Sequence, residues 1–399
     1  MTGWITSLRC RGRLLGLLWL LGFAILAQAQ GAVVVGAVVS QSGQQADLAA
    51  GYLKGILLWE AQVNAAGGLL GRPVELKVLD DGSDAVRASE LYRLLIREAK
   101  ADFLIGPYGS AATRAASAEA ERERRLMVNG AGPARVVQQG PSRFLFQTAA
   151  SYAARGEGVL QLARKAGITR LRILARQEFV AQEIAEATRL DALAQGFVAP
   201  AVEVYSPYTS DFAPFVQRAS AAGAQAWIAF GEARDAADMV KTFKKQGYAP
   251  QLFFARRASE PAFVTALGQD AEFTLAEMEY DPRLKDPANL EFVKAFTAKW
   301  AAAPGFAAAE GYVAASVLGE AVRRAGSLET ENVRAALAAL QMETPLGPYR
   351  VGANGQQLGI VPAVAQIQRG RAEVVWPFSL ETAQPLQPYP QWTDRRVLE

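Results

Sequence analysis

Residues 60–76 read EAQVNAAGGLLGRPVEL, and this stretch shows how the chain changes from helix to strand. Its first part completes an amphipathic run over residues 46–66 that predicts a helix. Gly67 and Gly68 end that run, because glycine is a poor helix former and readily takes a positive φ. Pro73 then opens a segment to residue 79 in which apolar and charged residues alternate, and this alternation is typical of a strand. A helix joined to a strand by a short glycine turn is a unit of an α/β fold.

The same alternation extends in both directions from this stretch, and it starts a second time near residue 152. Apolar runs predict strands at 32–39, 73–79, 101–105, 126–128, 144–146, 171–175, 198–205, 226–230 and 251–254. Amphipathic runs predict helices at 46–66, 83–100, 110–124, 152–166, 178–195, 211–222 and 235–246. Because such alternation gives parallel sheets covered on both faces, we predict two doubly wound α/β lobes.

The last third of the chain has a different pattern. Three helices with short links are predicted at 289–302, 307–325 and 330–340. Three strand-like runs follow at 347–351, 360–368 and 372–376. The final segment, 381–399, is rich in proline and polar residues, so we expect it to pack loosely.

The amino-terminal segment has the pattern of an export signal. Three arginines precede an apolar run over residues 14–27, and Ala27-Gln28-Ala29 forms a cleavage site. A membrane anchor is the alternative, but the run is shorter than the roughly 20 residues that span a bilayer. Cys10 lies before the run and so cannot be the lipidated cysteine of a lipoprotein. We therefore predict a cleaved signal peptide at 1–29 and a periplasmic protein that is not anchored to the membrane.

Composition excludes several classes of function. The whole chain has 42 basic and 39 acidic residues, and the signal segment holds three of the basic ones, so the mature chain is balanced. A balanced charge argues against nucleic acid or an anionic membrane as partner. The chain has no histidine, and its one cysteine lies in the signal segment, which removes Ser-His-Asp and Cys-His catalysis and most zinc sites. We expect no enzyme activity, no catalytic residue, no cofactor and no bound metal.

Motifs for phosphate, dinucleotide and metal binding are absent or irregular. The chain has no phosphate-binding loop and no G-x-G-x-x-G after a strand. Asp80, Asp81 and Asp84 form a tight carboxylate cluster, for which a divalent cation is conceivable. The spacing fits no regular metal loop, and a solvated strand end followed by a helix start is favoured.

Three glycine- and serine-rich loops follow predicted strands of the first lobe. They are residues 40–45 (SQSGQQ), 106–110 (GPYGS) and 129–134 (NGAGPA). Ligands of open α/β sheets bind at the carboxyl ends of the strands, where these loops meet. The second loop opens a helix and offers free backbone N–H groups to an anion or a carbonyl. Ordinary turns are the alternative for each loop taken alone.

These loops lie within a pattern that resembles the type I periplasmic solute-binding proteins of ABC importers, in the leucine/isoleucine/valine-binding family for hydrophobic amino acids and amides. Residues 60–76 match its "E-x-x-N-A-A-G-G" helix end and following "G-R-P" strand. Ile105-Gly106-Pro107 matches its "I-G-P" motif, and 205–212 is similar to its "Y-x-x-x-x-x-D-F" run. The resemblance covers roughly 32–376 and is stronger in the first lobe.

The resemblance implies a periplasmic binding protein-like fold with two lobes and a hinge of three crossovers. Lobe 1 would combine 31–148 with 282–345, and lobe 2 would combine 149–281 with 346–376, leaving 377–399 as a tail. The crossovers would lie near 147–148, 280–282 and 345–349. It also implies a small-molecule ligand, importer membrane subunits as partners, and amino-acid transport by a protein that we expect to be monomeric.

In that family the loops of the first lobe hold the ligand carboxylate through backbone N–H groups and hydroxyls. The matching positions are Ser42, Gly43, Tyr108, Gly109, Ser110, Gly130 and Gly132. The amino-acid binders usually have a threonine about where Gly132 lies, so one hydroxyl donor is missing.

The second lobe departs further from the family. Phe179 keeps the aromatic platform of the family's "Y-G-x-G" motif without its hydroxyl, and Glu232 lies where a tyrosine is expected. The loop that normally supplies an acidic residue for the ligand ammonium reads Ala255-Arg256-Arg257-Ala258. Arginine repels an ammonium and suits a carboxylate.

These departures favour an organic acid, aromatic or with two carboxylates, that uses Arg256 or Arg257 with Phe179 and Tyr108. An ordinary amino acid or amide is the alternative, with Glu232 as the ammonium contact or with the arginines facing solvent. A free-standing ligand-binding subunit of an extracellular sensing system is the alternative to an importer component.

Overall fold

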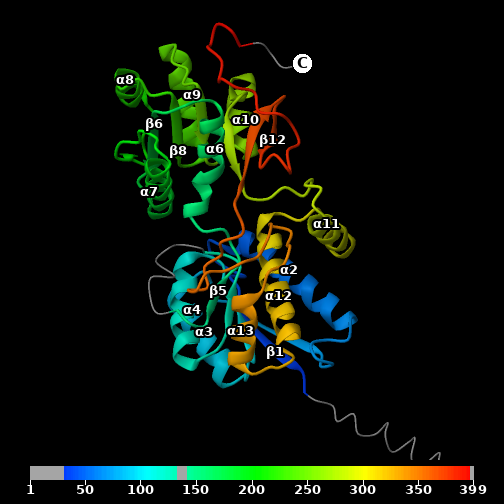
Figure 1. The fold of residues 1–399 in the computed structure, drawn as a ribbon. Helices are drawn as coiled ribbons and strands as arrows, with labels where there is room; N and C mark the ends of the chain where they lie inside the picture. Colours follow the sequence, from blue (N-terminus) through cyan, green and yellow to red (C-terminus); the bar gives the residue numbers. More distant parts are fainter. Residues whose placement is uncertain (1–30, 133–141, 396–399) are drawn as a thin grey trace, which may run out of the picture.

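The computed structural model describes residues 31–132 and 142–395. The predicted signal peptide and two residues of the third loop, Pro133 and Ala134, lie outside the described residues. The described chain forms two lobes, one above the other in Figure 1, that are joined by connecting segments. No helix in the described ranges is both long and apolar enough to cross a membrane.

The first lobe contains a parallel sheet whose strands follow the order β2-β1-β3-β4-β5. Its strands are β1 (Val33–Val38), β2 (Val74–Leu79), β3 (Phe103–Ile105), β4 (Met127–Asn129) and β5 (Leu145–Gln147). Its helices are α2 (Ala46–Ala65), α3 (Ala85–Arg97), α4 (Ser110–Glu123), α12 (Phe306–Ala325) and α13 (Thr330–Ala339). Alternate side chains of β1 point to opposite faces: Val35 packs among residues of α2 and α12, and Val38 among residues of α3 and α4. Both faces are therefore covered, as predicted for a doubly wound sheet.

The second lobe contains a larger sheet with the order β12-β11-β10-β9-β8-β6-β7. Its strands are β6 (Leu171–Arg176), β7 (Glu203–Tyr205), β8 (Ala226–Phe230), β9 (Leu252–Ala255), β10 (Leu275–Met278), β11 (Ala363–Gln368) and β12 (Arg371–Trp376). Its helices are α6 (Glu157–Lys165), α7 (Phe179–Ala194), α8 (Ala213–Ala221), α9 (Ala233–Gln246) and α10 (Pro261–Leu267), with short 3-10 turns η1 (Ala153–Gly156) and η2 (Gly268–Ala271). The prediction of two doubly wound lobes is confirmed. The strands β11 and β12 add an antiparallel hairpin, and α10 and β10 were not predicted.

Three segments connect the lobes. The chain leaves the first sheet after β5 and enters the second lobe at η1. It returns between β10 and α11 (Pro287–Trp300), because Phe292 and Phe296 of α11 pack against Leu58 of α2. Tyr349 is fully buried in the first lobe, and the Gln147 amide donates to the Gly355 carbonyl at 2.8 Å. We therefore propose that the third crossover lies within 358–362, later than the predicted 345–349.

The run predicted as a strand at 347–351 forms only isolated bridges, between Met342 and Tyr349 and between Val351 and Gln357. Tyr349 is buried, as expected of an apolar residue in a strand. The predicted strand does not form, because the segment has no continuous neighbouring strand with which to pair.

The segment after β12 packs against the second lobe rather than loosely, so that prediction was wrong. The Tyr389 amide donates to the Gln251 carbonyl at 2.8 Å, and the Trp392 indole donates to the Tyr248 carbonyl at 2.7 Å. The Arg395 guanidinium lies 3.8 Å from the centre of the Trp392 ring. The segment is polar overall, so its composition did not predict this packing. Tyr389 and Trp392 supply the buried apolar area that the rest of the segment lacks.

Candidate ligand site

The first loop, residues 40–45, is held by the loop that follows β2. Asp80 accepts from the Gln41 amide at 2.8 Å, the Ser42 hydroxyl at 2.8 Å and the Gly82 amide at 2.9 Å. These bonds, that of Gly82 first, lower the pKa of Asp80 to about 2. Asp81 accepts from the Ser40 hydroxyl at 2.6 Å. The acidic cluster therefore orders the loop, and the one proton of the Ser42 hydroxyl is already donated to Asp80.

Gly43 is the other predicted residue of this loop. Its φ of +82° lies in the left-handed region, and a Cβ there would come within 2.4 Å of the Gly82 carbonyl oxygen. Both the backbone angle and the close approach therefore require glycine. Ser42 and Gly43 are thus oriented toward the loop after β2 in this structure.

Removing the carboxylate in Asp80→Ala should weaken ligand binding about tenfold, because the loop loses several charge-assisted hydrogen bonds. Titration calorimetry at neutral pH measures the change, with Glu75→Ala on the exposed edge of β2 as control. Because the folded pKa is depressed, loop order is present above pH 4 and is lost as the pH falls toward 2. Unchanged affinity in Asp80→Ala would show that the hydrogen bonds between Asp80 and the first loop do not contribute to ligand binding.

The second and third loops touch through their backbones. Gly109 precedes α4 with a φ of +93°, and no side chain caps the amino end of this helix. Gly132 has a φ of +69°, and a Cβ there would lie 2.8 Å from the Ser110 amide nitrogen. The unpaired N–H groups of the first turn of α4 are a ready anion subsite. Gly109, Ser110 and Gly132 are therefore brought together as predicted.

A buried tyrosine supports these two loops from below. The Tyr52 hydroxyl of α2 donates to the Gly106 carbonyl at 3.1 Å and accepts from the Gly130 amide at 3.2 Å. Tyr52 also meets Tyr108 edge to face, with ring centroids 5.9 Å apart. Gly130 is thus tied to the scaffold by its amide, and Tyr108 is half-buried beside it.

The second lobe faces these loops through the segment that follows the first crossover. The Tyr152 hydroxyl lies 3.4 Å from the Ser110 hydroxyl, so the two lobes approach at the amino end of α4. Phe179 is the first residue of α7, and its side chain is exposed. Glu232 caps α9 in a reciprocal capping box with Asp235. Phe179 and Glu232 both lie at carboxyl ends of strands, as the sequence predicted.

The two arginines of the second lobe already have carboxylate partners. Arg256 donates to Glu277 at 3.0 Å, and its side chain is only 13% exposed. Arg257 lies between Glu232, at 3.3 Å, and Glu260. The predicted role of Arg257 as a partner for a ligand carboxylate therefore requires that it leave or share these carboxylates. Arg256 does not face solvent, in contrast to one of the alternatives.

A buried ionic network lies next to the hinge. Arg155, in η1, is paired with both Glu277 and Glu279. Burial opposes the charge of Arg155, but the two carboxylates outweigh it and raise the pKa of the guanidinium. Burial likewise disfavours the charge of Glu279, but Arg155 and Arg256 outweigh it and lower its pKa. The network therefore joins the first crossover to the second.

Glu310 on α12 reaches the same region from the first lobe. It is only 4% exposed, and its Oε2 has no hydrogen-bond partner among the described residues. Burial, then the charge of Glu279, raises its pKa well above the ordinary range. Burial also raises the pKa of Tyr108, and Glu310 and Glu279 add to that effect. Charges from both lobes thus act on Tyr108.

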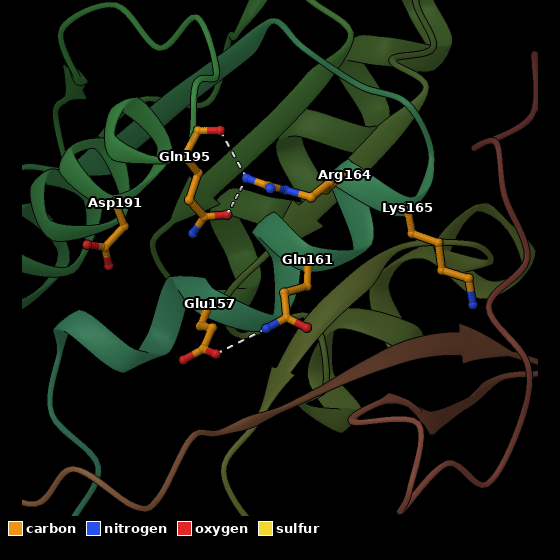
Figure 2. Close-up of a pocket in the computed structure, with 6 residues that line it drawn as sticks. All are labelled: Glu157, Gln161, Arg164, Lys165, Asp191 and Gln195. Atoms are coloured by element: carbon orange, nitrogen blue, oxygen red, sulfur yellow. Dashed lines mark hydrogen bonds between the residues drawn. The ribbon is translucent and has the colours of Figure 1, made fainter.

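A polar pocket of about 540 Å³ lies on the second lobe, between α6 and the end of α7 (Figure 2). Its lining residues are Glu157, Gln161, Arg164, Lys165, Asp191 and Gln195. Arg164 donates to the Gln195 carbonyl at 2.9 Å, and Gln161 donates to Glu157 at 3.1 Å. None of these residues follows the carboxyl end of a strand, so the pocket is separate from the candidate site.

Sequence reasoning missed the groups that surround the loops: Tyr52, Tyr152, Arg155, Glu277, Glu279 and Glu310. A signal was available for Glu310, which is the one charge in the otherwise apolar run from Phe306 to Leu318. Arg155 and Glu279 carried no such signal, because each pairs with a residue more than 100 positions away.

The family model described as periplasmic binding protein matches residues 32–372. The leucine-, isoleucine-, valine-, threonine- and alanine-binding protein of Pseudomonas aeruginosa is 24% identical over 339 residues, covering 84% of this chain and 90% of that protein.

Solved structures share the fold. An ABC transporter substrate-binding protein from Sphaerobacter thermophilus has a TM-score of 0.72 and 21% identity, covering 90% of this chain and 99% of that one. A solute-binding protein of an ABC transporter from R. palustris, solved with benzoate, has a TM-score of 0.65 and 20% identity, covering 86% and 96%. The fold, the three loops and the matched family model agree, and the chain belongs to the periplasmic binding protein family.

Proposed function

We propose that this chain is the exported substrate-binding component of an ABC importer and captures a small carboxylate-bearing solute between its lobes. The observation that carries the proposal is the uncapped amino end of α4, where Gly109, Ser110 and Gly132 meet. Backbone N–H groups there match a carboxylate, and no lysine or arginine is needed to hold it.

The relatives support a carboxylate as the shared feature of the ligand. The Pseudomonas aeruginosa protein is named for leucine, isoleucine, valine, threonine and alanine, and the R. palustris protein was solved with benzoate. These ligands differ in their side chains and share only the carboxylate. We therefore propose that the first lobe reads the carboxylate, and that the solute is an organic or aromatic acid, an amino acid or an amide.

The proposed mechanism is binding without chemistry. The solute contacts both lobes and so stabilises a closed arrangement, which the membrane subunits of the importer recognise. The three crossovers permit such closure because they are short connecting segments. Export to the periplasm and action as a monomer belong to the same proposal.

A thermal-shift screen of the mature chain tests the proposal. The panel holds amino acids, amides, aliphatic dicarboxylates and aromatic acids, and each carboxylate is matched by its primary amide or alcohol. A ligand at 100 times its Kd should stabilise the fold by about 2.7 kcal/mol. Stabilisation by a carboxylate and not by its neutral counterpart is the expected result. Equal stabilisation by both members of a pair would show that α4 does not read an anion.

A further inference from the structure

A further cavity, with a volume of about 360 Å³, lies at the hinge. Its walls come from the second crossover, the third crossover, the first-lobe segment 343–348 and the start of the segment that follows β12. None of the residues that the sequence predicted for ligand binding lines it. The hinge cavity is therefore a separate space from the candidate ligand site, although both lobes contribute to it.

Three turns contribute to the walls of the hinge cavity: 281–284, 344–347 and 377–380. Each is closed by a hydrogen bond from its last amide to its first carbonyl, at 3.1, 2.9 and 2.9 Å respectively. The turn at 344–347 belongs to the first lobe, and the turn at 377–380 belongs to the second. The width of the cavity therefore depends on the angle between the lobes, whereas each wall keeps its own shape.

Trp376 forms a fixed aromatic wall of the hinge cavity. The residue is 7% exposed, and its indole donates to Gln161 of α6 at 3.1 Å. A Cβ at Gly158 would lie 2.6 Å from the Trp376 ring, so the ring packs directly on α6. Leucine, valine, methionine and proline side chains make up most of the remaining lining. An apolar wall that is already in place suits an aromatic ring, because little ordering is needed on binding.

The charged part of the lining is acidic. Glu279, Asp286 and Glu343 line the hinge cavity, and the basic residues of the second crossover, Arg283 and Lys285, do not. Glu279 is already paired within the buried network. Asp286 and Glu343 form no ion pair among the described residues. An ammonium group near these two carboxylates would be attracted, and a carboxylate would be repelled.

We propose that the hinge cavity is a second ligand site, which binds a small aromatic amine with its ring beside Trp376 and its ammonium toward Asp286 and Glu343. The volume of the cavity lies within the range of small-molecule sites. Such a molecule needs no carboxylate, so the anion subsite at α4 does not recognise it.

A molecule in the hinge cavity contacts both lobes and stabilises the arrangement of lobes in which it fits. The amine and the carboxylate solute should therefore change each other's affinity, because both act on the angle between the lobes. This coupling rests on the proposed function, whereas the binding of the amine does not.

Tryptamine is the probe for the hinge cavity, and ligand-observed NMR titrations of the mature chain measure its affinity. It is compared with ethylamine, which lacks the ring, and with tryptophol, in which a hydroxyl replaces the ammonium. Tryptamine should bind at least about tenfold more tightly than ethylamine, and about fivefold more tightly than tryptophol, as a partly exposed ion pair predicts. Equal affinity of tryptamine and tryptophol would overturn the preference for an amine. No binding of any probe would overturn the site.

Variants then place the amine in the molecule. Asp286→Asn combined with Glu343→Gln should remove the preference for tryptamine over tryptophol. Asparagine can still cap α11, as Asp286 does, so the fold should be kept. Glu90→Gln, on an exposed position of α3, is the matched control and should change nothing. Gly132→Ala should leave the affinity for tryptamine unchanged, and a loss there would place the amine between the lobes and overturn the hinge site.

The coupling is measured by repeating the tryptamine titration with the best carboxylate from the thermal-shift screen at saturation. The affinity should change by at least about fivefold, and the carboxylate affinity should change by the same factor when tryptamine is bound. Direct competition between the two molecules overturns the separate site. An unchanged affinity overturns the coupling and leaves the amine site intact. Failure of every carboxylate to bind counts against the proposed function and not against the hinge site.

Discussion

Replacing Arg155 by methionine should lower the free energy of unfolding by about 3 to 5 kcal/mol, the range found when one partner of a buried ion pair is removed. The Arg155 side chain is 4% exposed, and its loss leaves Glu277 with Arg256 alone and leaves Glu279 with no other ion-pair partner among the described residues. Methionine fills much of the same volume, which limits the contribution of a cavity. Urea unfolding measures the change, since the free energy falls linearly with urea concentration.

A double variant distinguishes charge from packing. If the uncompensated carboxylate causes the loss, then Arg155→Met combined with Glu279→Gln should recover at least half of it, because Glu279 is the carboxylate left without an ion-pair partner among the described residues. The surface pair of Arg143 and Glu331 provides the matched control, because both side chains are about half exposed. Arg143→Met should cost less than about 1 kcal/mol. A loss that small in Arg155→Met would show that the network does not stabilise the hinge.

The lobes could be predicted from the sequence because their signals are local. The helix at 46–66 and the strand at 73–79 are each set by periodicity and by the glycines between them, and both are present as α2 and β2. The hairpin of β11 and β12 was predicted as two strands, but β11 joins the sheet by antiparallel pairing with β10, a strand that was not predicted. Position in the chain alone does not reveal such pairing.

The placement of the candidate site residues was predictable only in the first lobe, for the same reason. Gly109, Ser110 and Gly132 belong to loops that directly follow strands, so the fold alone brings them to one edge. In contrast, the second lobe was interpreted from the arginines at 256 and 257 without their partners. Glu277 becomes a neighbour of Arg256, and Glu232 of Arg257, only when the strands of the second sheet are assembled, whereas Glu260 lies three residues after Arg257 and was overlooked. The sequence shows the sign of a charged side chain, but the fold determines which distant residue pairs with it.

Gly132 should be the position where one added methyl group most reduces ligand binding. Its φ of +69° strains any side chain, and a Cβ would lie 2.7 Å from the Gly109 carbonyl carbon and 2.8 Å from the Ser110 amide nitrogen. Real Cβ atoms do not approach backbone so closely, so the second loop must move away from the third. The N–H groups that we assign to the carboxylate would move with it. Gly132→Ala should therefore weaken carboxylate binding about a hundredfold, corresponding to strain and displacement of about 2 to 3 kcal/mol.

Gly71 supplies a control for backbone strain alone. Its φ of +77° is similar, but a Cβ there would have no neighbour within 4 Å, and the residue lies in the turn before β2. Gly71→Ala should lower the melting temperature by a few degrees and leave the affinity unchanged. Wild-type affinity in Gly132→Ala, measured by titration with the best carboxylate from the screen, would contradict the assignment of the anion subsite to α4.

The geometry also accounts for the missing threonine of the family pattern. A β-branched residue at a positive φ is a conformational outlier, so a threonine at position 132 would be more strained here than alanine. Gly132→Thr should therefore fail to restore a hydroxyl contact and should bind more weakly than Gly132→Ala. If Gly132→Thr instead bound more tightly than the wild type, the loop would have to adopt a negative φ when the ligand is bound. We therefore propose that, in the conformation described here, the backbone N–H groups of α4 suffice for a carboxylate without that hydroxyl.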